Sequence, residues 1–529
     1  MLRINEIKLP IEHSNEDLVK KIRSLLKSDC DFSYEIVRRS LDARKKPNLF
    51  FSYMVDISVS NEDKVLKRAD SRVIKSSTVE YKFPYSIDNI SEDKRPVIIG
   101  LGPAGLFAGL YLAKAGFRPI IIERGEPIDL RTKTVEEFWE KGRLNPNSNV
   151  QFGEGGAGAF SDGKLNTMVK DKYGRNKAVL KDLVRFGAPS EIIYDYKPHV
   201  GTDILKTVVK NITKEIVSLG GEIYYQSKVD SFIVENNTLK SIGLNNKTQF
   251  KDRNVILAVG HSARDTFELL KECGLNMTPK PFAIGFRVEH SAELINLSQY
   301  GASNVRILGN APYKITHTCE DGRGVYSFCM CPGGYVVNAS SEEGRLCVNG
   351  MSYYKRDSKA SNSAIIITVN PEDYGDGCNP LSGVEFQRRL EAKAYEIGGG
   401  DIPIERFDEF TDRKISDVNT KTIDPCVKGN WKHSAVHEIL NDNLNKDFIE
   451  GMNAFGSKIK GFNNPDTLVM GIEARTSSPI RMERSDICES NIENLFPCGE
   501  GAGYAGGITS AAMDGILVAQ NVAAKILGI

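Results

Sequence analysis

The chain has 529 residues, and because a single hydrophobic core rarely grows beyond roughly 250 to 300 residues, we expect at least two globular units. Hydrophobic residues at 40% and charged residues at 26% lie in the ordinary range of globular proteins. Lys+Arg and Asp+Glu each number 69, and this balance excludes a global field that would draw the protein to nucleic acid or acidic membranes.

The N-terminal residues carry no long apolar stretch and no small-residue cleavage site, so we expect no signal peptide. No window approaches 18 uninterrupted apolar residues, so we expect no membrane partner. Ten cysteines are too sparse for a disulfide scaffold. These features predict a cytoplasmic protein with reduced thiols.

Residues 1–90 predict a small α+β module that ends at a polar stretch, residues 88–95. Strands are expected at residues 2–9, 49–59 and 73–85, and helices at residues 15–26 and 34–44. Residues 38–46 hold five basic residues and one acid. We interpret this stretch as a solvated helix end, with a grip on phosphate as the alternative.

A glycine loop follows the first strand of the next unit. Val97-Ile98-Ile99 runs into Gly100-Leu101-Gly102-Pro103-Ala104-Gly105, and residues 106–115 predict a helix. Such glycines permit a tight turn, close approach of phosphate and close helix packing, with pyrophosphate at the helix N-terminus. The next strand ends at Glu123-Arg124, where a carboxylate can accept both hydroxyls of an adenosine ribose. This order predicts a Rossmann-type dinucleotide-binding domain over residues 91–275.

Two further segments favour FAD over NAD. Residues 150–164 contain five glycines among small and polar residues, which suits a backbone that follows the ribityl chain and pyrophosphate of a flavin. The contacts predicted there come from Gly155, Gly156, Gly158, Ser161 and Lys164. Residues 255–259 predict a strand that ends at Gly260 in the cofactor crevice. The alternative interpretation of residues 150–164 is a mobile surface loop, and that of residues 255–259 is an ordinary core strand.

Residues 276–474 predict a β-rich α+β substrate domain, with strands at 325–330 and 364–369 and a helix at 383–395. Residues 475–529 then complete the first sheet. Their strand ends in a glycine loop that contains Gly499, Glu500, Gly507 and Ile508, and a helix follows over residues 510–527. The positive N-terminal end of this helix would favour negative charge at flavin N1 and O2.

The order of these segments resembles the glutathione-reductase-type FAD fold, an α/β class in which a substrate domain interrupts one Rossmann unit. Three motifs are similar to those of bacterial FAD-dependent dehydrogenases, or NAD(P)/FAD-dependent oxidoreductases, without an assigned reaction: Phe328-Cys329-Met330-Cys331-Pro332-Gly333-Gly334, Asn349-Gly350-Met351-Ser352 and Arg475-Thr476-Ser477-Ser478-Pro479. The resemblance implies that Glu123 holds the adenosine ribose. It also implies that Gly499-Glu500 replaces the usual Gly-Asp pair at the ribityl chain. No second strand-linked glycine motif is present in the sequence, so NAD(P)H is expected only as a transient electron donor.

Two cysteines and an arginine are candidates for catalysis. Cys329 and Cys331 would point to one face of a strand, either as structural thiols or in a redox or substrate contact. Arg475 could place a guanidinium over the flavin or a carboxylate substrate, or it could belong to a capped turn.

Weaker candidates lie nearby in the sequence. Arg287 and His290 lie close together in the sequence: His290 could donate a proton, or Glu289 could simply pair with Arg287 on a solvated face. His317 and Cys319 precede the two cysteines, but their spacing matches no recognised zinc pattern. We therefore predict no metal site.

The predicted function is an FAD-dependent oxidoreductase that transfers a hydride between flavin N5 and an unknown small-molecule substrate. A flavoprotein whose N-terminal module binds RNA or a protein partner through residues 38–46 is the alternative. The two combine in a third hypothesis, flavin-dependent RNA modification.

Overall fold

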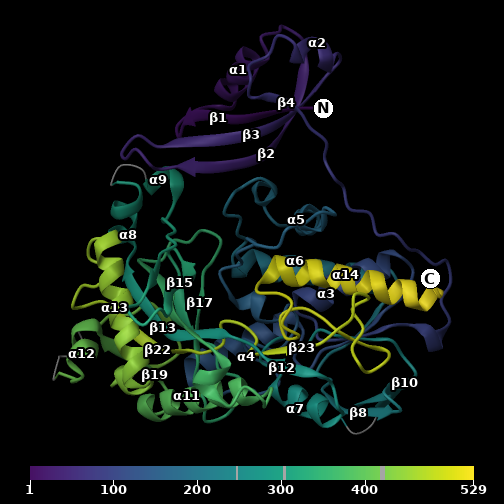
Figure 1. Cartoon of the computed structure of the whole chain (residues 1–529), viewed down its shortest axis with the longest axis vertical. Helices are drawn as coiled ribbons and strands as arrows, with labels where there is room; N and C mark the ends of the chain where they lie inside the picture. Colours follow the sequence, from purple (N-terminus) through teal and green to yellow (C-terminus); the bar gives the residue numbers. More distant parts are fainter. Residues whose placement is uncertain (246–247, 302–304, 417–422) are drawn as a thin grey trace.

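The computed structural model describes residues 1–245, 248–301, 305–416 and 423–529. A small N-terminal module joins a body built around two larger sheets through a long extended segment (Figure 1). No helix among the described residues has both the length and the apolarity needed to cross a membrane. All ten cysteines are free.

The N-terminal module is an antiparallel sheet of order β2-β3-β1-β4. Its core, mostly Leu, Ile and Val side chains, comes from this sheet and from helices α1 and α2. Ser14 and Asp17 form a capping box that begins α1. The elements are β1 (Leu2–Pro10), α1 (Asn15–Leu26), β2 (Phe32–Asp42), β3 (Phe50–Val59), α2 (Glu62–Leu66) and β4 (Val73–Lys75).

The helix predicted at residues 34–44 is wrong, because that segment is strand β2. It pairs with β3 from Phe32↔Val59 to Asp42↔Phe50, with a bulge between Ile36 and Arg38. Its aromatic and β-branched side chains gain cross-strand partners, which outweigh a helical spacing of apolar residues. The strand predicted at residues 73–85 covers only Val73–Lys75.

A five-stranded parallel sheet of order β24-β11-β5-β6-β7 forms the second unit. Four helices, α3, α5, α6 and α14, share a core on one face, and a small antiparallel sheet with α7 packs near the other. Strand β24 comes from the C-terminal segment and pairs with β11. The elements are β5 (Val97–Ile99), α3 (Pro103–Lys114), β6 (Ile120–Ile122), α4 (Ile128–Lys141), α5 (Arg175–Arg185), α6 (Thr202–Ser218), β7 (Glu222–Tyr224), β8 (Val229–Glu235), β9 (Thr238–Leu244), β10 (Thr248–Lys251), β11 (Val255–Leu257), α7 (Arg264–Glu272), β24 (Leu495–Pro497) and α14 (Ile508–Leu527).

A seven-stranded sheet of order β14-β15-β18-β13-β22-β19-β21 forms the third unit. Helices α12 and α13 pack on it around a large aromatic and aliphatic core. The elements are β13 (Phe282–Ser291), α8 (Ala292–Gln299), α9 (Val305–Leu308), β14 (Thr316–Thr318), β15 (Gly324–Cys331), β16 (Tyr335–Asn338), β17 (Val348–Met351), β18 (Ala360–Val369), α10 (Pro371–Tyr374), α11 (Ser382–Gly398), β19 (Ile402–Arg406), α12 (Phe407–Asp412), β20 (Val427–Lys428), β21 (Trp431–His433), α13 (Asp442–Lys458) and β22 (Leu468–Glu473).

Two short strands connect these units: β12 (Met277–Pro279) and β23 (Ile480–Met482) pair antiparallel where the chain enters and leaves the seven-stranded sheet. The mixed α/β class is confirmed, and the strands predicted at 325–330 and 364–369 and the helix at 383–395 are present. The domain boundaries at residues 90, 275 and 474 stay predictions.

Candidate functional site

A cavity of about 360 Å³ lies at the carboxyl ends of β5 and β11. Here the strand order of the parallel sheet reverses, which is where open α/β sheets bind ligands. The lining comes from the first glycine loop (residues 100–105), the second (residues 150–164), the C-terminal one (residues 499–507) and the seven-stranded sheet.

The glycine loops touch through their backbones. A Cβ on Gly156 would lie 2.8 Å from the Cα of Gly102, and one on Gly100 would lie 2.4 Å from the carbonyl oxygen of Ala258. Gly100 and Gly156 also have φ of +99° and +60°, a region that favours glycine. Side chains at these positions would force the loops apart.

Two helices begin at this cavity. Gly102 is the N-cap of α3 and Gly507 is the N-cap of α14, and glycine has no side chain that could accept a hydrogen bond from the first turn of the helix. The amides of the first helical turns are therefore suited to anionic groups of a ligand. The two helices pack tightly, since a Cβ on Gly515 would lie 2.1 Å from the carbonyl oxygen of Ala104.

Glu123 organises the loops at one end of the cavity. Its carboxylate accepts hydrogen bonds from the backbone N–H groups of Leu101 at 2.8 Å and of Gly125 and Gly153 at 2.9 Å. The side chain is buried yet lines the cavity. These contacts join both glycine loops to the end of β6. The predicted ribose contact stays a prediction.

Arg131 holds the second glycine loop from behind and was missed in the sequence. Its guanidinium donates to the backbone carbonyls of Asn149, Val150, Gly153 and Glu154. Burial lowers the pKa of this fully enclosed guanidinium to about 10. A basic residue on the buried side of α4, between Ile128 and Val135, was the signal available in the sequence.

Part of the lining comes from strands β15 and β22 of the seven-stranded sheet and the segment after β22; this part, here called the far wall, comprises Cys329, Glu473, Arg475 and Thr476. Glu473 forms a buried ion pair with Arg287, whose Nε lies 2.6 Å from Oε2. Burial nevertheless raises the pKa of Glu473 to about 7, against the opposing effect of Arg287. Arg287 itself lies behind the wall. Sequence reasoning missed Glu473 because its role depends on pairing between β13 and β22.

Cys329 occupies a β-bulge between Phe328 and Cys331, with φ of +44°. A hydrogen bond from Cys331 lowers the pKa of the Cys329 thiol well below its ordinary value, and Lys164 and Arg287 act in the same direction. The pKa of Cys331 is raised in turn. The bulge thus presents one acidified thiol to the cavity and keeps its partner buried.

Arg475 lines the cavity, but its donors are engaged. Nε and Nη2 donate to Glu391 at 2.8 and 2.7 Å, and Nη1 donates to Ser262 and Ser341. Glu391 is shared with Arg264, and its pKa is lowered by the two arginines in spite of its burial. Because its donors are used within the protein, Arg475 is placed to hold Glu391, Ser262 and Ser341 in position rather than to bind the carboxylate of a substrate.

His290 lies elsewhere, because its Nε2 is 2.7 Å from the carbonyl oxygen of Phe462 and it does not line the cavity. Burial lowers its pKa to about 4, so it is neutral near pH 7. His261, by contrast, lines the cavity as a neutral group, since burial lowers its pKa to about 3.

Comparison with known proteins places this geometry in context. Residues 281–476 match the family described as "FAD-dependent protein, C-terminal domain-like", and residues 1–58 match a "Domain of unknown function (DUF8436)". An "Uncharacterized protein" of Clostridium beijerinckii is 47% identical over 533 residues, which cover 99% of each chain. The chain belongs to the same family as this clostridial protein. The family match confirms FAD as the cofactor.

Solved structures are similar only at a low level. The glycerol-3-phosphate dehydrogenase of Bacillus halodurans, complexed with FAD, is 10% identical with a TM-score of 0.37 over 83% of this chain and 66% of that one. The halogenase PltM is 12% identical with a TM-score of 0.37 over 83% and 70% of the two chains. The quinol fumarate reductase FrdA of E. coli is 12% identical with a TM-score of 0.34 over 82% and 70%.

The residues present fit FAD, because glycine backbones and two helix N-termini face one cavity. Most of the predicted cofactor residues line it, namely Gly100, Gly102, Pro103, Ala104, Glu123, Arg124, Gly156, Gly158, Ser161, Lys164, Gly260, Glu500, Gly507 and Ile508. Gly105, Gly155 and Gly499 do not line the cavity. A Cβ on any of them would meet a neighbouring backbone or side-chain atom at 3.1 Å or less.

Proposed function

We propose that the protein is an FAD-dependent oxidoreductase, a dehydrogenase or reductase, whose small-molecule substrate lies against the far wall. The observation that carries the proposal is that two kinds of groups line one cavity. Glycine loops and helix N-termini form part of the lining, and the far wall adds a thiol, a carboxyl group and a guanidinium. When bound, FAD supplies hydride transfer at N5.

The chain's own groups support proton transfer near neutral pH. Burial raises the pKa of both Glu473 and Glu500 to about 7, and both carboxyl groups line the cavity. An acid or base works best when its pKa is close to the operating pH. Glu473 is held in place by Arg287, and the charge of Lys280 opposes the rise in the pKa of Glu500. We assign these two carboxyl groups to holding or releasing the substrate's proton.

Anaerobic reduction of the purified holoprotein tests the proposal. NADH, NADPH and a panel of small alcohols, hydroxy acids and amines are mixed with it, and loss of flavin absorbance is followed. At least one compound should reduce the flavin with saturation, and Glu473→Gln should slow this reduction. Cys378→Ala, which changes an exposed cysteine outside the cavity, is the matched control. Acid-released cofactor other than FAD, or equal rates for Glu473→Gln and wild type, would contradict it.

Binding of RNA by the N-terminal module is less well supported. Arg39 pairs with Asp195 at 2.7 Å, Arg44 pairs with Asp42 at 2.6 Å, and the guanidinium of Arg38 lies 4.2 Å from the ring centroid of Tyr196. These contacts leave fewer charges for phosphate. Salt-sensitive RNA binding that is lost on charge reversal at Arg44, Lys45 and Lys46 would favour this alternative.

A further inference from the structure

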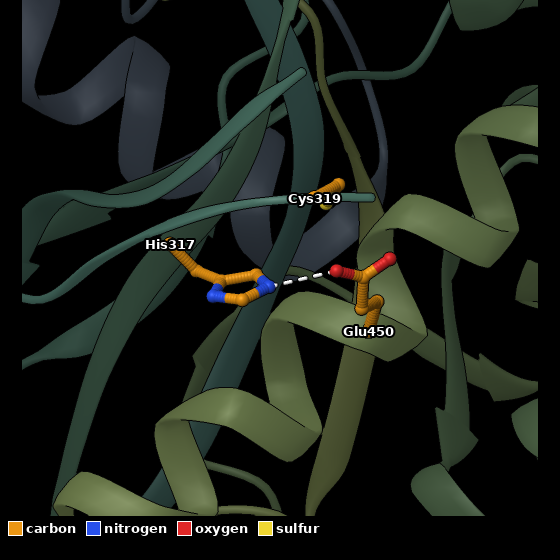
Figure 2. A group of neighbouring side chains, drawn as sticks. All are labelled: His317, Cys319 and Glu450. Carbon is orange, nitrogen blue, oxygen red and sulfur yellow. Dashed lines mark hydrogen bonds and ion pairs between the residues drawn. The ribbon is translucent and has the colours of Figure 1, made fainter. Parts of the chain in front are cut away.

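A second cluster of reactive side chains lies away from the cavity, beside helix α13. His317 belongs to β14, Cys319 follows that strand, and Glu450 lies on α13 (Figure 2). Their ligand-capable atoms all lie within 4.8 Å of one another, and His317 Nε2 is 2.8 Å from Glu450 Oε1. None of the three lines the cavity.

Local structure explains why these side chains meet. His317 lies in β14 and Cys319 lies directly after the strand, in the turn that leads to β15. The backbone N–H of Cys319 donates to the carbonyl of Arg323 at 2.8 Å and fixes the turn after the strand. Glu450 anchors the same turn from the helix by accepting the backbone N–H of Glu320 at 3.1 Å.

More carboxylate groups surround the sulfur atom of Cys319. Cys319, Asp321 and Asp447 form a second group whose ligand atoms also lie within 4.8 Å of one another. Asp447 is 4% exposed, and its Oδ2 makes no hydrogen bond within the described part of the chain. The nearest cation is Arg323, whose Nε lies 3.5 Å from this oxygen.

The charges of the cluster do not balance. Arg323 is shared, because Asp373 takes its two terminal nitrogens at 2.8 and 3.0 Å. Lys446 lies 3.9 Å from Glu320, on the solvent side. Three carboxylates, from Asp321, Asp447 and Glu450, therefore surround Cys319 with one shared arginine as their close counter-charge. Asp447 is buried, Glu450 is partly buried and Asp321 is exposed, and a buried carboxylate without sufficient counter-charge favours a bound cation.

We propose that His317, Cys319 and Glu450 bind one divalent cation of the zinc class and so fasten the turn after β14 to helix α13. One imidazole nitrogen, one sulfur and one carboxylate oxygen are the donors that Zn²⁺ takes in proteins, whereas Mg²⁺ and Ca²⁺ prefer oxygen alone. His317 and Glu450 are 27% and 26% exposed, so water can reach a fourth position. The site does not depend on the proposed oxidoreductase function.

Zn²⁺ takes cysteine as a thiolate, so binding would release the proton of the Cys319 sulfur. The cation takes the place of this proton and of the hydrogen bond between His317 and Glu450. The His317 nitrogen, the Cys319 sulfur and the Glu450 oxygen then all coordinate the same ion. The sequence gives no local signal for this group of side chains, because Glu450 lies 133 residues from His317.

Zinc titration of the full-length holoprotein after chelator treatment tests the proposal. Calorimetry should give one tight Zn²⁺ per chain, and X-ray absorption should give one Zn–S distance of about 2.3 Å with shorter Zn–N and Zn–O distances. Glu450→Gln and Cys319→Ser should each weaken binding at least tenfold. Cys378→Ser, at an exposed cysteine outside the cluster, should leave binding unchanged.

FAD content of each variant separates loss of the metal site from loss of the fold. If Cys319→Ser no longer holds FAD, Glu450→Gln, at a partly exposed position, decides the question. Absence of stoichiometric Zn²⁺ in wild type, or equal affinity in wild type and Glu450→Gln, would overturn the proposal.

Discussion

The carboxylate of Glu123 accepts the backbone N–H of Gly153 at 2.9 Å and thereby joins the end of β6 to the second glycine loop. The same carboxylate accepts the N–H of Leu101 in the first loop. One side chain thus fixes the relative position of two loops that line the cavity.

Glu123→Gln should weaken FAD binding and lower thermal stability together. The amide group of glutamine meets three backbone donors with one acceptor oxygen, and each buried donor left without a partner costs about 1–3 kcal/mol. Fluorescence titration and calorimetry measure the two effects. Glu137→Gln, in an exposed pair with Lys141, is the control. Unchanged FAD affinity would reject the organising role of Glu123.

Gly156→Ala should lose FAD, because the new Cβ would lie 2.8 Å from the Cα of Gly102. Gly142→Ala is a matched control: its φ of +70° is similar to the +60° of Gly156, but nothing lies within 4 Å of a Cβ there. Both variants carry backbone strain of about 1 kcal/mol, and only Gly156→Ala separates the loops. Equal FAD content of the two purified variants would contradict close loop contact at the cofactor site.

Local signals in the sequence were sufficient to predict the glycine loops, because a strand, a loop, a helix and an acidic residue follow one another there in the order expected of a dinucleotide-binding unit. The same reasoning failed at β2, where cross-strand pairing with β3 decides the structure. Glu473 and Glu450 gave no local signal, because each meets its partner across more than 130 residues of chain. Long-range pairing of strands and helices creates such sites, and one sequence does not reveal it.

Cys329 should react faster with iodoacetamide than the other thiols at pH values below the ordinary pKa of cysteine. The hydrogen bond from Cys331 lowers its pKa, so the reactive thiolate persists at lower pH. Cys331→Ala removes that donor, and the rate at pH 7 should fall. Mass spectrometry of labelled peptides measures the rates in the holoprotein, with exposed Cys378 as internal reference. A rate at Cys329 that Cys331→Ala leaves unchanged would show that the pair is not coupled.

Glu500 should make the protein less stable as the pH rises through neutrality. Burial raises its pKa from 4.5 to about 7, so folding favours the protonated carboxyl group. The stabilising contribution is fully present below about pH 4.5 and is lost as the pH rises through about 7. Each unit of pKa shift corresponds to about 1.4 kcal/mol, and because the group lines a cavity we expect a loss of about 1–3 kcal/mol.

Glu500→Gln stays uncharged and should remove this part of the pH dependence. Urea denaturation of wild type and variant at steps from pH 4.5 to 8 measures the free energy of unfolding, with exposed Glu483→Gln as the control. If the wild-type and Glu500→Gln curves run parallel over this window, the carboxyl group is not held protonated and its assignment to proton transfer fails.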